Sequence, residues 1–517
     1  MTRRSSLPCA LALALGFGFP GISSPSRSSP PRFDDPGAPA RVDAYIESAL
    51  RAWNVPGAAV VLVTPGETLL CRGYGTRRAG ADEPVDDSTL FSIASNTKAF
   101  TAAALGILAS EGRLDWDDRV ADRLPWFQLA EPETTRKLTI RDCLCHRAGL
   151  PLWGGDLLWW NSRYDRAEVL RRLRYLEPAY DFRAGYAYNN LLFVAAGEII
   201  PAVAEGESWE TFVRSRLFVP LGMRRTTATL AEASSDPNFA LGHTLRDGVP
   251  VTVSLTNADT GAAAGAIVSC ARDFVPWLKL HLNDGRHEGR VVVPSAALSE
   301  MRRPHTLIPF VGAERKLFPM SHFYAYGLGL FLRDFRGQLL TQHGGALDGM
   351  FSYVSIAPGA GIAAAVFTNR DHHRLAMALT YYLLDHFLAD APEDWSQRFL
   401  DAAPAPAKST HPSPPGRDPG GSLPAGLDGT YQNTFYGEAS IASSAGRAIL
   451  TLSAHPDFPA EIVPLPGGSI HARFADPVFG SNPLSFELGE DGRVAAFRIR
   501  VRPDWVDTVS YRFERKE

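Results

Sequence analysis

Helical and strand patterns alternate along most of the chain. Near its start, ARVDAYIESALRAWNVPGAAVVLVTPGETLLCRGYG (residues 40–75) shows a helical repeat of apolar positions followed by two apolar runs. Pro and Gly in TPGE (residues 64–67) predict a turn that joins these runs as two strands. Amphipathic helices and short apolar strands continue to about Ala389, which predicts one domain of mixed helices and strands over residues 40–392.

The pattern changes after this domain. Residues 401–426, DAAPAPAKSTHPSPPGRDPGGSLPAG, are rich in Pro, Gly and Ser and cannot bury a core, so we interpret them as a linker. Residues 427–517 alternate polar and apolar positions, as in LSFELGEDGRVAAFRIRV, where EDG predicts a turn. This alternation predicts a small all-β domain of short antiparallel strands.

The N-terminal segment has the layout of a secretory signal. Arg3 and Arg4 precede an apolar run from Leu7 to Phe19, which is too short for a membrane-spanning helix of about 20 residues. We interpret residues 1–24 as a cleavable signal and residues 25–39 as a flexible lead-in. The protein is therefore expected in the periplasm or outside the cell, without a stable membrane anchor after signal removal; the export route stays open.

Composition and charge exclude some partners. Of 517 residues, 45% are hydrophobic and 21% charged, and the formal net charge is -4. Without a basic stripe, nucleic acid is not expected as a partner, and a small molecule or short peptide is the better candidate substrate. The five Cys residues show no disulfide framework or metal-ligand spacing, so we expect inert thiols and no cofactor or metal.

A serine and the single lysine of the stretch FSIASNTKAFTAAALGILASEG (residues 91–112) lie three residues apart near its start. The helix is predicted to begin near Ala94 and end at Gly112, and residues three apart on it, Ser95 and Lys98, share a face. A serine hydroxyl is a weak nucleophile unless a base takes its proton, and lysine can be that base only if its pKa is lowered. The alternative is an exposed Ser and Lys on a helix surface.

Two later motifs supply further groups that an acyl-transfer site needs. Tyr188 and Asn190 lie in GYAYNN, just before an apolar helix. His343 and Gly345 lie in QHGGA after a predicted strand, where glycines permit close approach of another backbone. With Ser95 and Lys98, these motifs supply a nucleophile, proton carriers, a polar group for the substrate amide and a strand edge that can bind the substrate.

In this order, Ser-x-x-Lys, Tyr-x-Asn and His-x-Gly resemble the three motifs of the serine beta-lactamase-like, penicillin-recognising hydrolase family. LTIRDCLCHRAGLP (residues 138–151) and YGLGL (residues 326–330) resemble its connecting segments, and the likeness extends from about Ala40 to Ala389. It implies an α+β fold, with an antiparallel sheet flanked by helices, an all-helical insert and a C-terminal all-β, barrel-like domain. GYAYNN and the β domain are most similar to D-aminopeptidase-like and esterase-like members.

The resemblance also implies catalytic roles. Ser95 would be the acylated nucleophile, and Lys98 would hold its geometry and share its proton. Tyr188 would be the general base in acylation and the general acid toward the leaving group, its phenol kept ionisable by Lys98. Which of the two takes the first proton stays open.

Further residues would bind the substrate. Asn190 would hydrogen-bond its carbonyl or amide, and the backbone N–H groups of Ser95 and Ala346 would form the oxyanion hole. His343 and Gly345 belong to the substrate-binding strand. Asn369, at a strand end, is a candidate for reaching a substrate carboxylate.

His343 decides the expected substrate. Many beta-lactamases carry Lys at this position, whereas a histidine of ordinary pKa is mostly neutral at pH 7 and holds a carboxylate less firmly. We therefore expect hydrolysis of D-amino-acid peptides or related amides and esters. A beta-lactamase and a non-turnover penicillin-binding sensor or scaffold are the alternatives. Because such C-terminal domains mediate oligomers in some similar proteins, a homo-oligomer is one expectation.

Other residues have two interpretations. Trp153, Trp159 and Trp160 either line the mouth of the site or, as we expect, pack the helical insert. His146 is expected to cap carbonyls at a helix end. RDHHR (residues 370–374) is expected to be a solvated turn and not a metal site, and the second Tyr-x-Asn, at Tyr431, a chance match in a strand.

Overall fold

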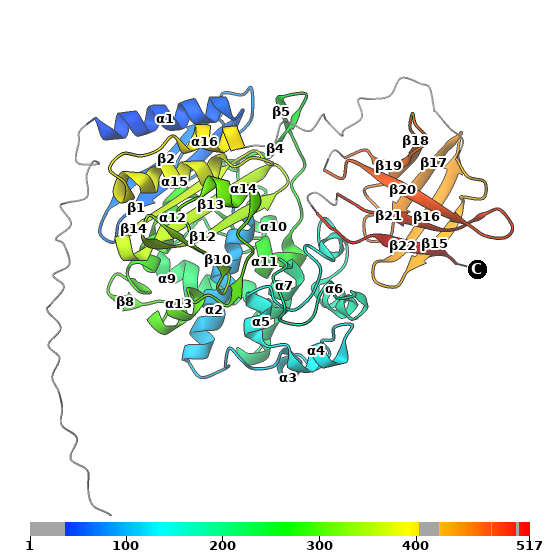
Figure 1. Cartoon of the computed structure of the whole chain (residues 1–517), viewed down its shortest axis with the longest axis horizontal. Coiled ribbons are helices and arrows are strands. Elements are labelled where there is room, and N and C mark those ends of the chain that lie inside the picture. Colours follow the sequence, from blue (N-terminus) through cyan, green and yellow to red (C-terminus); the bar gives the residue numbers. More distant parts are fainter. Residues whose placement is uncertain (1–36, 403–422, 477, 503–505, 517) are drawn as a thin grey trace, which may run out of the picture.

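The structure, a computed structural model, describes residues 37–402, 423–476, 478–502 and 506–516 (Figure 1). The predicted signal, residues 1–24, lies outside the described residues, as do most of the predicted lead-in and linker. Within the described ranges, no helix is long and apolar enough to cross a membrane.

An eight-stranded antiparallel sheet forms the centre of the large domain, as predicted. Its strand order is β2-β1-β14-β13-β12-β11-β10-β9, so the first strands of the chain pair with the last strands of the domain. The strands are β1 (Gly57–Val63), β2 (Thr68–Gly75), β9 (Thr306–Leu307), β10 (Tyr324–Tyr326), β11 (Phe331–Phe335), β12 (Gln338–Leu347), β13 (Met350–Ala357) and β14 (Ile362–Thr368).

Helices cover both faces of this sheet (Figure 1). Alternate residues of β1 enter two cores: Val60 and Leu62 pack with residues of α1, α15 and α16, and Val61 and Val63 with residues of α2 and α12. Burial on both faces explains why β1 is apolar throughout. The helices are α1 (Ala38–Ala52), α2 (Thr97–Ser110), α12 (Ala271–Leu282), α15 (Leu375–Leu388) and α16 (Trp395–Ala402).

A helical region follows α2 and precedes the later strands of the sheet, in agreement with the expected insert. Its elements are α3 (Val120–Arg123), α4 (Pro132–Lys137), α5 (Ile140–Leu144), α6 (Arg166–Arg172), α7 (Asn190–Val203), α8 (Trp209–Val213), α9 (Val219–Leu221), α10 (Leu230–Ala233) and α11 (Ala262–Gly265). The remaining elements are β3 (Phe91–Ser92), β4 (His243–Arg246), β5 (Val249–Thr252), β6 (Val268–Ser269), β7 (Arg286–His287), β8 (Arg290–Val291), α13 (Ser295–Met301) and α14 (Gly312–Leu317).

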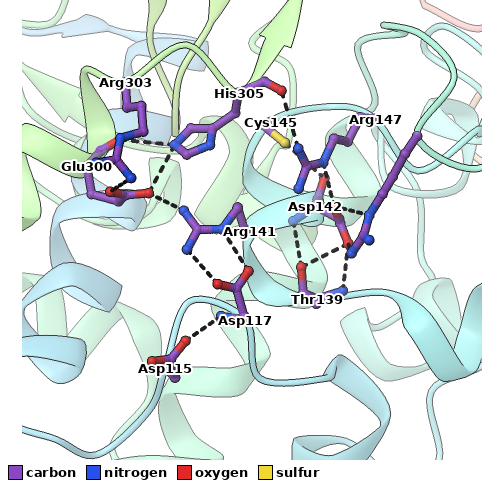
Figure 2. A network of polar contacts seen from close by, with 11 residues as sticks. Asp115, Asp117, Thr139, Arg141, Asp142, Cys145, Arg147, Glu300, Arg303 and His305 are labelled. Atoms are coloured by element: carbon purple, nitrogen blue, oxygen red, sulfur yellow. Dashed lines mark hydrogen bonds and ion pairs between the residues drawn. The ribbon is translucent and has the colours of Figure 1, made fainter. Parts of the chain in front are cut away.

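Figure 2 shows a network of charged side chains around α5. Asp142 is fully buried, forms a capping box with Thr139, and accepts a hydrogen bond from Arg147. Arg141 of the same helix pairs with Glu300 of α13. Because buried carboxylates are stable only when paired, this network fixes α5 and the chain that follows it into the site.

The C-terminal domain is a closed eight-stranded antiparallel barrel, which confirms the barrel-like expectation. Tyr431 lies in β15 with its side chain buried, and its hydroxyl donates to the Leu427 carbonyl at 2.6 Å, so this second Tyr-x-Asn is part of a strand. The strands are β15 (Gly429–Asn433), β16 (Gly437–Ser444), β17 (Arg447–Leu452), β18 (Ala460–Pro464), β19 (Ile470–Phe474), β20 (Ser481–Leu488), β21 (Val494–Ile499) and β22 (Tyr511–Arg515).

The barrel contacts the helical region at residues 152–164 and at Arg172 of α6, which donates to the Phe435 carbonyl at 2.9 Å. His455 of the barrel is bonded through Nε2 to the Trp160 carbonyl at 2.9 Å. One carboxylate oxygen of Asp507, Oδ2, accepts hydrogen bonds from the backbone N–H groups of Gly155 and Leu157, both at 3.1 Å. The second domain therefore holds a loop of the first.

Both ends of the large domain differ from the predicted boundaries. Helix α1 begins at Ala38, inside the predicted lead-in, because Pro39 suits the first turn of a helix. The sequence places the domain end at residue 392 and the linker start at 401, yet α16 runs from Trp395 to Ala402. Trp395 and Phe399 are buried against the domain core, so the domain extends to residue 402.

Replacing Trp395 by alanine tests whether α16 belongs to the folded core. The side chain is 2% exposed, stacks near Phe318 and donates through Nε1 to Asp385, so Trp395→Ala should lower the free energy of unfolding by about 3–5 kcal/mol. Urea unfolding followed by circular dichroism measures this. Gln397→Ala, on the exposed side of the same helix, is the control and should change it by less than about 0.5 kcal/mol. Equal effects would exclude α16 from the core.

Candidate active site

Ser95 lies in a single 3-10 turn (Ala94–Asn96) that leads directly into α2. Ala94 adopts a φ of 47°, in the left-handed region that non-glycine residues rarely occupy. Lys98 follows one turn later, and its Nζ lies 3.0 Å from Ser95 Oγ. The structure therefore brings together the pair that the spacing predicts, at the N-terminal end of a helix.

Lys98 is completely buried, and three oxygens surround its Nζ. Besides Ser95 Oγ, these are Oδ1 of Asn190 at 2.7 Å and the carbonyl of Ala264 at 2.8 Å. Burial lowers the pKa of Lys98 to about 7, although the Asp156 carboxylate opposes this shift. A neutral amine donates two N–H groups, so the two carbonyl oxygens can take both and leave the lone pair for the Ser95 hydroxyl.

Tyr188 lies beside this pair, where burial disfavours the ionised form of its phenol. Its ring centroid is 4.8 Å from Lys98 Nζ, and its buried hydroxyl has no partner at full hydrogen-bond geometry within the described residues. Burial raises the pKa of the phenol, and the nearby Ser95 hydroxyl offsets only part of this rise. The expectation that Lys98 keeps the phenol ionisable stays a prediction, and the raised pKa of Tyr188 does not favour it.

His343 lies on β12 and faces the same cavity. Its Nδ1 donates to the Gly344 carbonyl at 2.7 Å, and its Nε2 accepts from the Tyr326 hydroxyl at 2.8 Å, a pairing that fits a neutral ring. Burial, with Lys98 nearby, lowers the pKa of His343 to about 3. The ring is thus neutral at pH 7, as the sequence predicts.

Gly345 acts by packing. A Cβ at this position would lie 2.0 Å from the Ile93 carbonyl oxygen and 2.4 Å from Ser352 Oγ, so only glycine lets β12 approach the turn that carries Ser95. Ala346, the next residue, lines the cavity together with Ser95.

Asn369 does not line the cavity. Its side chain accepts from the Gly57 N–H at 2.8 Å and donates to the carbonyls of Thr76 and Arg77 at 3.0 and 2.9 Å. All three contacts tie β14 to the neighbouring end of β1 and β2. The prediction that Asn369 reaches a substrate carboxylate is corrected on this ground.

His146 also differs from its predicted role. Its Nδ1 accepts the backbone N–H of Asn189 at 3.1 Å, so it does not cap helix carbonyls. Its ring lies 4.2 Å from that of Tyr188, between centroids, and burial keeps its pKa well below the usual range. His146 therefore positions the Tyr188–Asn190 turn from behind.

The cavity in front of Ser95 has a volume of about 590 Å³ and mostly aromatic walls. Trp153, Trp159 and Trp160 all line it, and Trp159 and Trp160 are also buried in the hydrophobic core, so both interpretations hold for these two. The other aromatic lining residues are Tyr186, Tyr188, Tyr324, Phe331, Phe351 and Tyr353. An apolar or aromatic substrate group fits such walls.

The charged residues of the cavity wall are missing from the sequence prediction. Asp156 and Glu314 line the cavity, as does Arg374, which pairs with Glu314. They lie far apart in sequence and at no motif spacing, so only the fold reveals them. The segment RDHHR is not a solvated turn, because Arg370 and Asp371 are buried, although no metal-binding cluster of three or more ligands occurs in the described chain.

The Ser95–Lys98 pair, the Tyr188–Asn190 turn and strand β12 meet at one cavity on a sheet flanked by helices, an arrangement that suits a serine hydrolase. The chain belongs to the beta-lactamase family, because the Beta-lactamase family model matches residues 42–387. Members of this family are serine hydrolases.

Individual proteins extend this likeness. The chain is 27% identical over 491 residues to the unguisins hydrolase ungD' of Aspergillus campestris, covering 89% of each chain, and 29% identical over 325 residues to penicillin-binding protein 4 of Amycolatopsis lactamdurans, covering 61% and 81%. A D-amino acid amidase from Ochrobactrum anthropi SV3 matches with a TM-score of 0.55 at 25% identity, over 70% and 98% of the two chains.

One further match bears on the fold alone. The octameric penicillin-binding protein homologue from Pyrococcus abyssi superposes with a TM-score of 0.61 at 20% identity and covers 92% of this chain and 99% of its own. Because this match covers 92% of the chain, the likeness in fold extends beyond the large domain.

The rate of Ser95 labelling should depend on the protonation of Lys98. The pKa of Lys98 is lowered to about 7, so the free amine is scarce below this pH and labelling by a fluorophosphonate should accelerate as pH rises through about 7. His343, with a pKa near 3, should add no step between pH 4 and 6. Stopped-assay mass spectrometry across pH 4–9 measures the profile. A rate independent of pH over this range would contradict a lysine base.

Gly345→Ala should disturb the approach of β12 to the Ser95 turn. The new Cβ must displace backbone at Ile93, so we expect labelling to slow at least ten-fold and the free energy of unfolding to fall by about 1–3 kcal/mol. Gly344→Ala is the matched comparison, since its Cβ would meet side chains and no backbone, the Tyr353 ring at 3.2 Å and the Phe351 ring at 3.6 Å. If the two variants lose the same rate, the packing role of Gly345 is refuted.

Proposed function

We propose that the protein is an exported serine hydrolase that forms an acyl-enzyme at Ser95 and cleaves amide or ester bonds, foremost in peptides or small amides that contain D-amino acids. The observation that carries this proposal is the buried Lys98 amine, which lies 3.0 Å from the Ser95 hydroxyl. Export rests on the signal-like pattern of residues 1–24 alone.

In the proposed reaction, Lys98 Nζ takes the hydroxyl proton of Ser95 while Oγ attacks the substrate carbonyl carbon. Backbone N–H groups of Ser95 and Ala346 stabilise the oxyanion. The C–N or C–O bond then breaks, and the leaving amine or alcohol takes a proton that passes from the Lys98 ammonium through the Tyr188 hydroxyl. Water repeats the sequence on the ester and releases the acid. This assigns the base to Lys98 and a relay to Tyr188.

The cavity supports substrates without a free carboxylate at the scissile end. Neutral His343 gives no positive charge, Asn369 lies elsewhere, and the Arg374 guanidinium is paired with Glu314. Aromatic walls suit an apolar side chain. The likeness to an enzyme named D-amino acid amidase and to one named unguisins hydrolase supports amide bonds as the target.

A penicillin-binding protein without efficient turnover is the second candidate. The 29% identity to penicillin-binding protein 4 of Amycolatopsis lactamdurans favours it. A homo-oligomer is proposed on the likeness to an octameric homologue. Neither proposal changes the role of Ser95.

Three substrates distinguish these functions. We expect purified protein to hydrolyse D-alanyl p-nitroanilide faster than its L isomer and to form no long-lived adduct with benzylpenicillin, as measured by absorbance and intact mass. Ser95→Ala, the control, should lose all turnover. A persistent penicilloyl adduct without anilide hydrolysis would replace the hydrolase with the sensor, and rapid penicillin hydrolysis would make the protein a beta-lactamase.

A further inference from the structure

A buried carboxyl group lies directly behind the site. Asp156, in the loop between α5 and α6, is 4% exposed. Its Oδ2 accepts from Asn190 Nδ2 at 2.6 Å, and its Oδ1 accepts from Trp159 Nε1 at 2.9 Å. Both partners, the amide N–H of Asn190 and the indole N–H of Trp159, can only donate. An ionised carboxylate can accept from both, whereas the O–H group of a protonated carboxyl would find no acceptor in these two partners.

The other end of the Asn190 amide faces Lys98. Asn190 Oδ1 accepts from Lys98 Nζ at 2.7 Å, so the amide joins the carboxylate to the amine. If the amide rotated by half a turn, its N–H group would point at Nζ and occupy the lone pair that Ser95 needs. Asp156 decides between the two orientations, because its Oδ2 accepts from Asn190 Nδ2 and so keeps the amide nitrogen turned toward Asp156 and away from Lys98.

We propose that Asp156 is a positioning residue: its carboxylate holds the Asn190 amide with the oxygen toward Lys98, which keeps the lone pair of Nζ directed at Ser95, and its charge stabilises the ammonium formed when Nζ takes the serine proton. In this step the O–H bond of Ser95 breaks and an N–H bond forms at Lys98 Nζ. The proton moves from Ser95 Oγ to Lys98 Nζ, and Asp156 stays ionised.

Burial and the neighbouring Asp507 carboxylate oppose the ionisation of Asp156. Burial raises its pKa to about 8, and the Asp507 carboxylate of the barrel adds to this, while Trp159, Asn190 and Lys98 lower it. Tyr511, which donates to Asp507, stays neutral because burial raises its pKa. The barrel thereby influences the pH at which the site becomes active.

Ionisable groups around Lys98 are neutral at pH 7. Burial lowers the pKa values of His146 and His343 and raises that of Tyr188. Asp156 is therefore the group near Lys98, among the described residues, whose charge changes close to neutral pH. Acylation then requires that Lys98 and Asp156 each lose a proton. On the acid side of the pH profile, the acylation rate should therefore rise more steeply than for a single titrating group.

Asp156→Asn tests the orientation. An amide here presents a donor to Asn190, so Asn190 should rotate and block Nζ, and fluorophosphonate labelling should slow about 100-fold with the fold intact. Asp348→Asn, a buried carboxyl in the same cavity wall that bonds Trp160 and Thr256, is the matched control and should leave the midpoint and steepness of the pH profile unchanged.

Exchanging the two groups should restore the arrangement. In Asp156→Asn with Asn190→Asp, the new amide donates to the new carboxylate, which accepts from Lys98, so we expect at least about ten-fold recovery of the lost rate. The acid limb should move to higher pH, because a carboxylate in contact raises the pKa of Lys98. If Asp156→Asn does not fold, the double variant decides alone: labelling with a raised acid limb supports the proposal, and its absence overturns it.

The labelling tests of this inference rest on the proposed function, because they need a reactive Ser95. A measurement of the Lys98 pKa tests the inference independently. The chain has only six Lys residues, so the side-chain signals of ¹³C,¹⁵N-lysine-labelled protein can be resolved, and Lys98→Arg assigns the signal of Lys98. Asp156→Asn should lower the pKa of Lys98 by about one pH unit whether or not Ser95 reacts. An unchanged pKa, or a folded Asp156→Asn protein that labels within about three-fold of the wild type, would overturn the proposal.

Discussion

The site depends on a lysine amine that is buried without direct contact to a carboxylate. Lys98 is 0% exposed, and the groups that meet its Nζ are a hydroxyl, a side-chain amide and a backbone carbonyl. An ammonium in such surroundings pays a large desolvation cost, so the amine loses its proton far below its ordinary pKa and becomes a base at neutral pH. The low pKa follows from burial, and burial follows from the packing of α2 inside the domain.

Three separate segments must meet for this environment to exist. The turn at Ser95 brings the hydroxyl, the start of α7 brings Asn190, and β12 closes the cavity because Gly345 has no side chain to hold it away from Ile93. Polar groups then fix the helical region behind the cavity, including the network around Asp142. The Asp507 carboxylate of the barrel accepts two backbone hydrogen bonds from the loop that carries Asp156. The small domain thus helps to hold the site in place.

Local patterns predicted much of this architecture. The Ser95 helix, the turn before α7, the glycine-containing strand and the barrel follow from spacing and alternation that neighbouring residues specify. Such local patterns do not predict which side chains from distant segments contact one another. Asp156 meets Asn190 across 34 positions, and Asn369 turns toward the β1 end instead of the cavity, because tertiary packing and not spacing decides where these side chains bond. The raised pKa of Tyr188 could not be predicted from spacing either, since burial depends on the whole fold.

The central claim is that Ser95 is the nucleophile and that Lys98 takes its proton. Locating the acyl group on the protein tests this claim most directly. Rapid acid quench of wild-type protein with a p-nitrophenyl ester of an N-blocked D-amino acid, followed by trypsin, releases the peptide of residues 79–98, which contains Ser95. We predict one acyl group per chain on this peptide, located by fragmentation at Ser95. It should be absent from Ser95→Ala and much slower to form in Lys98→Arg. Steady hydrolysis without a covalent adduct, or an adduct on another residue, would contradict the account.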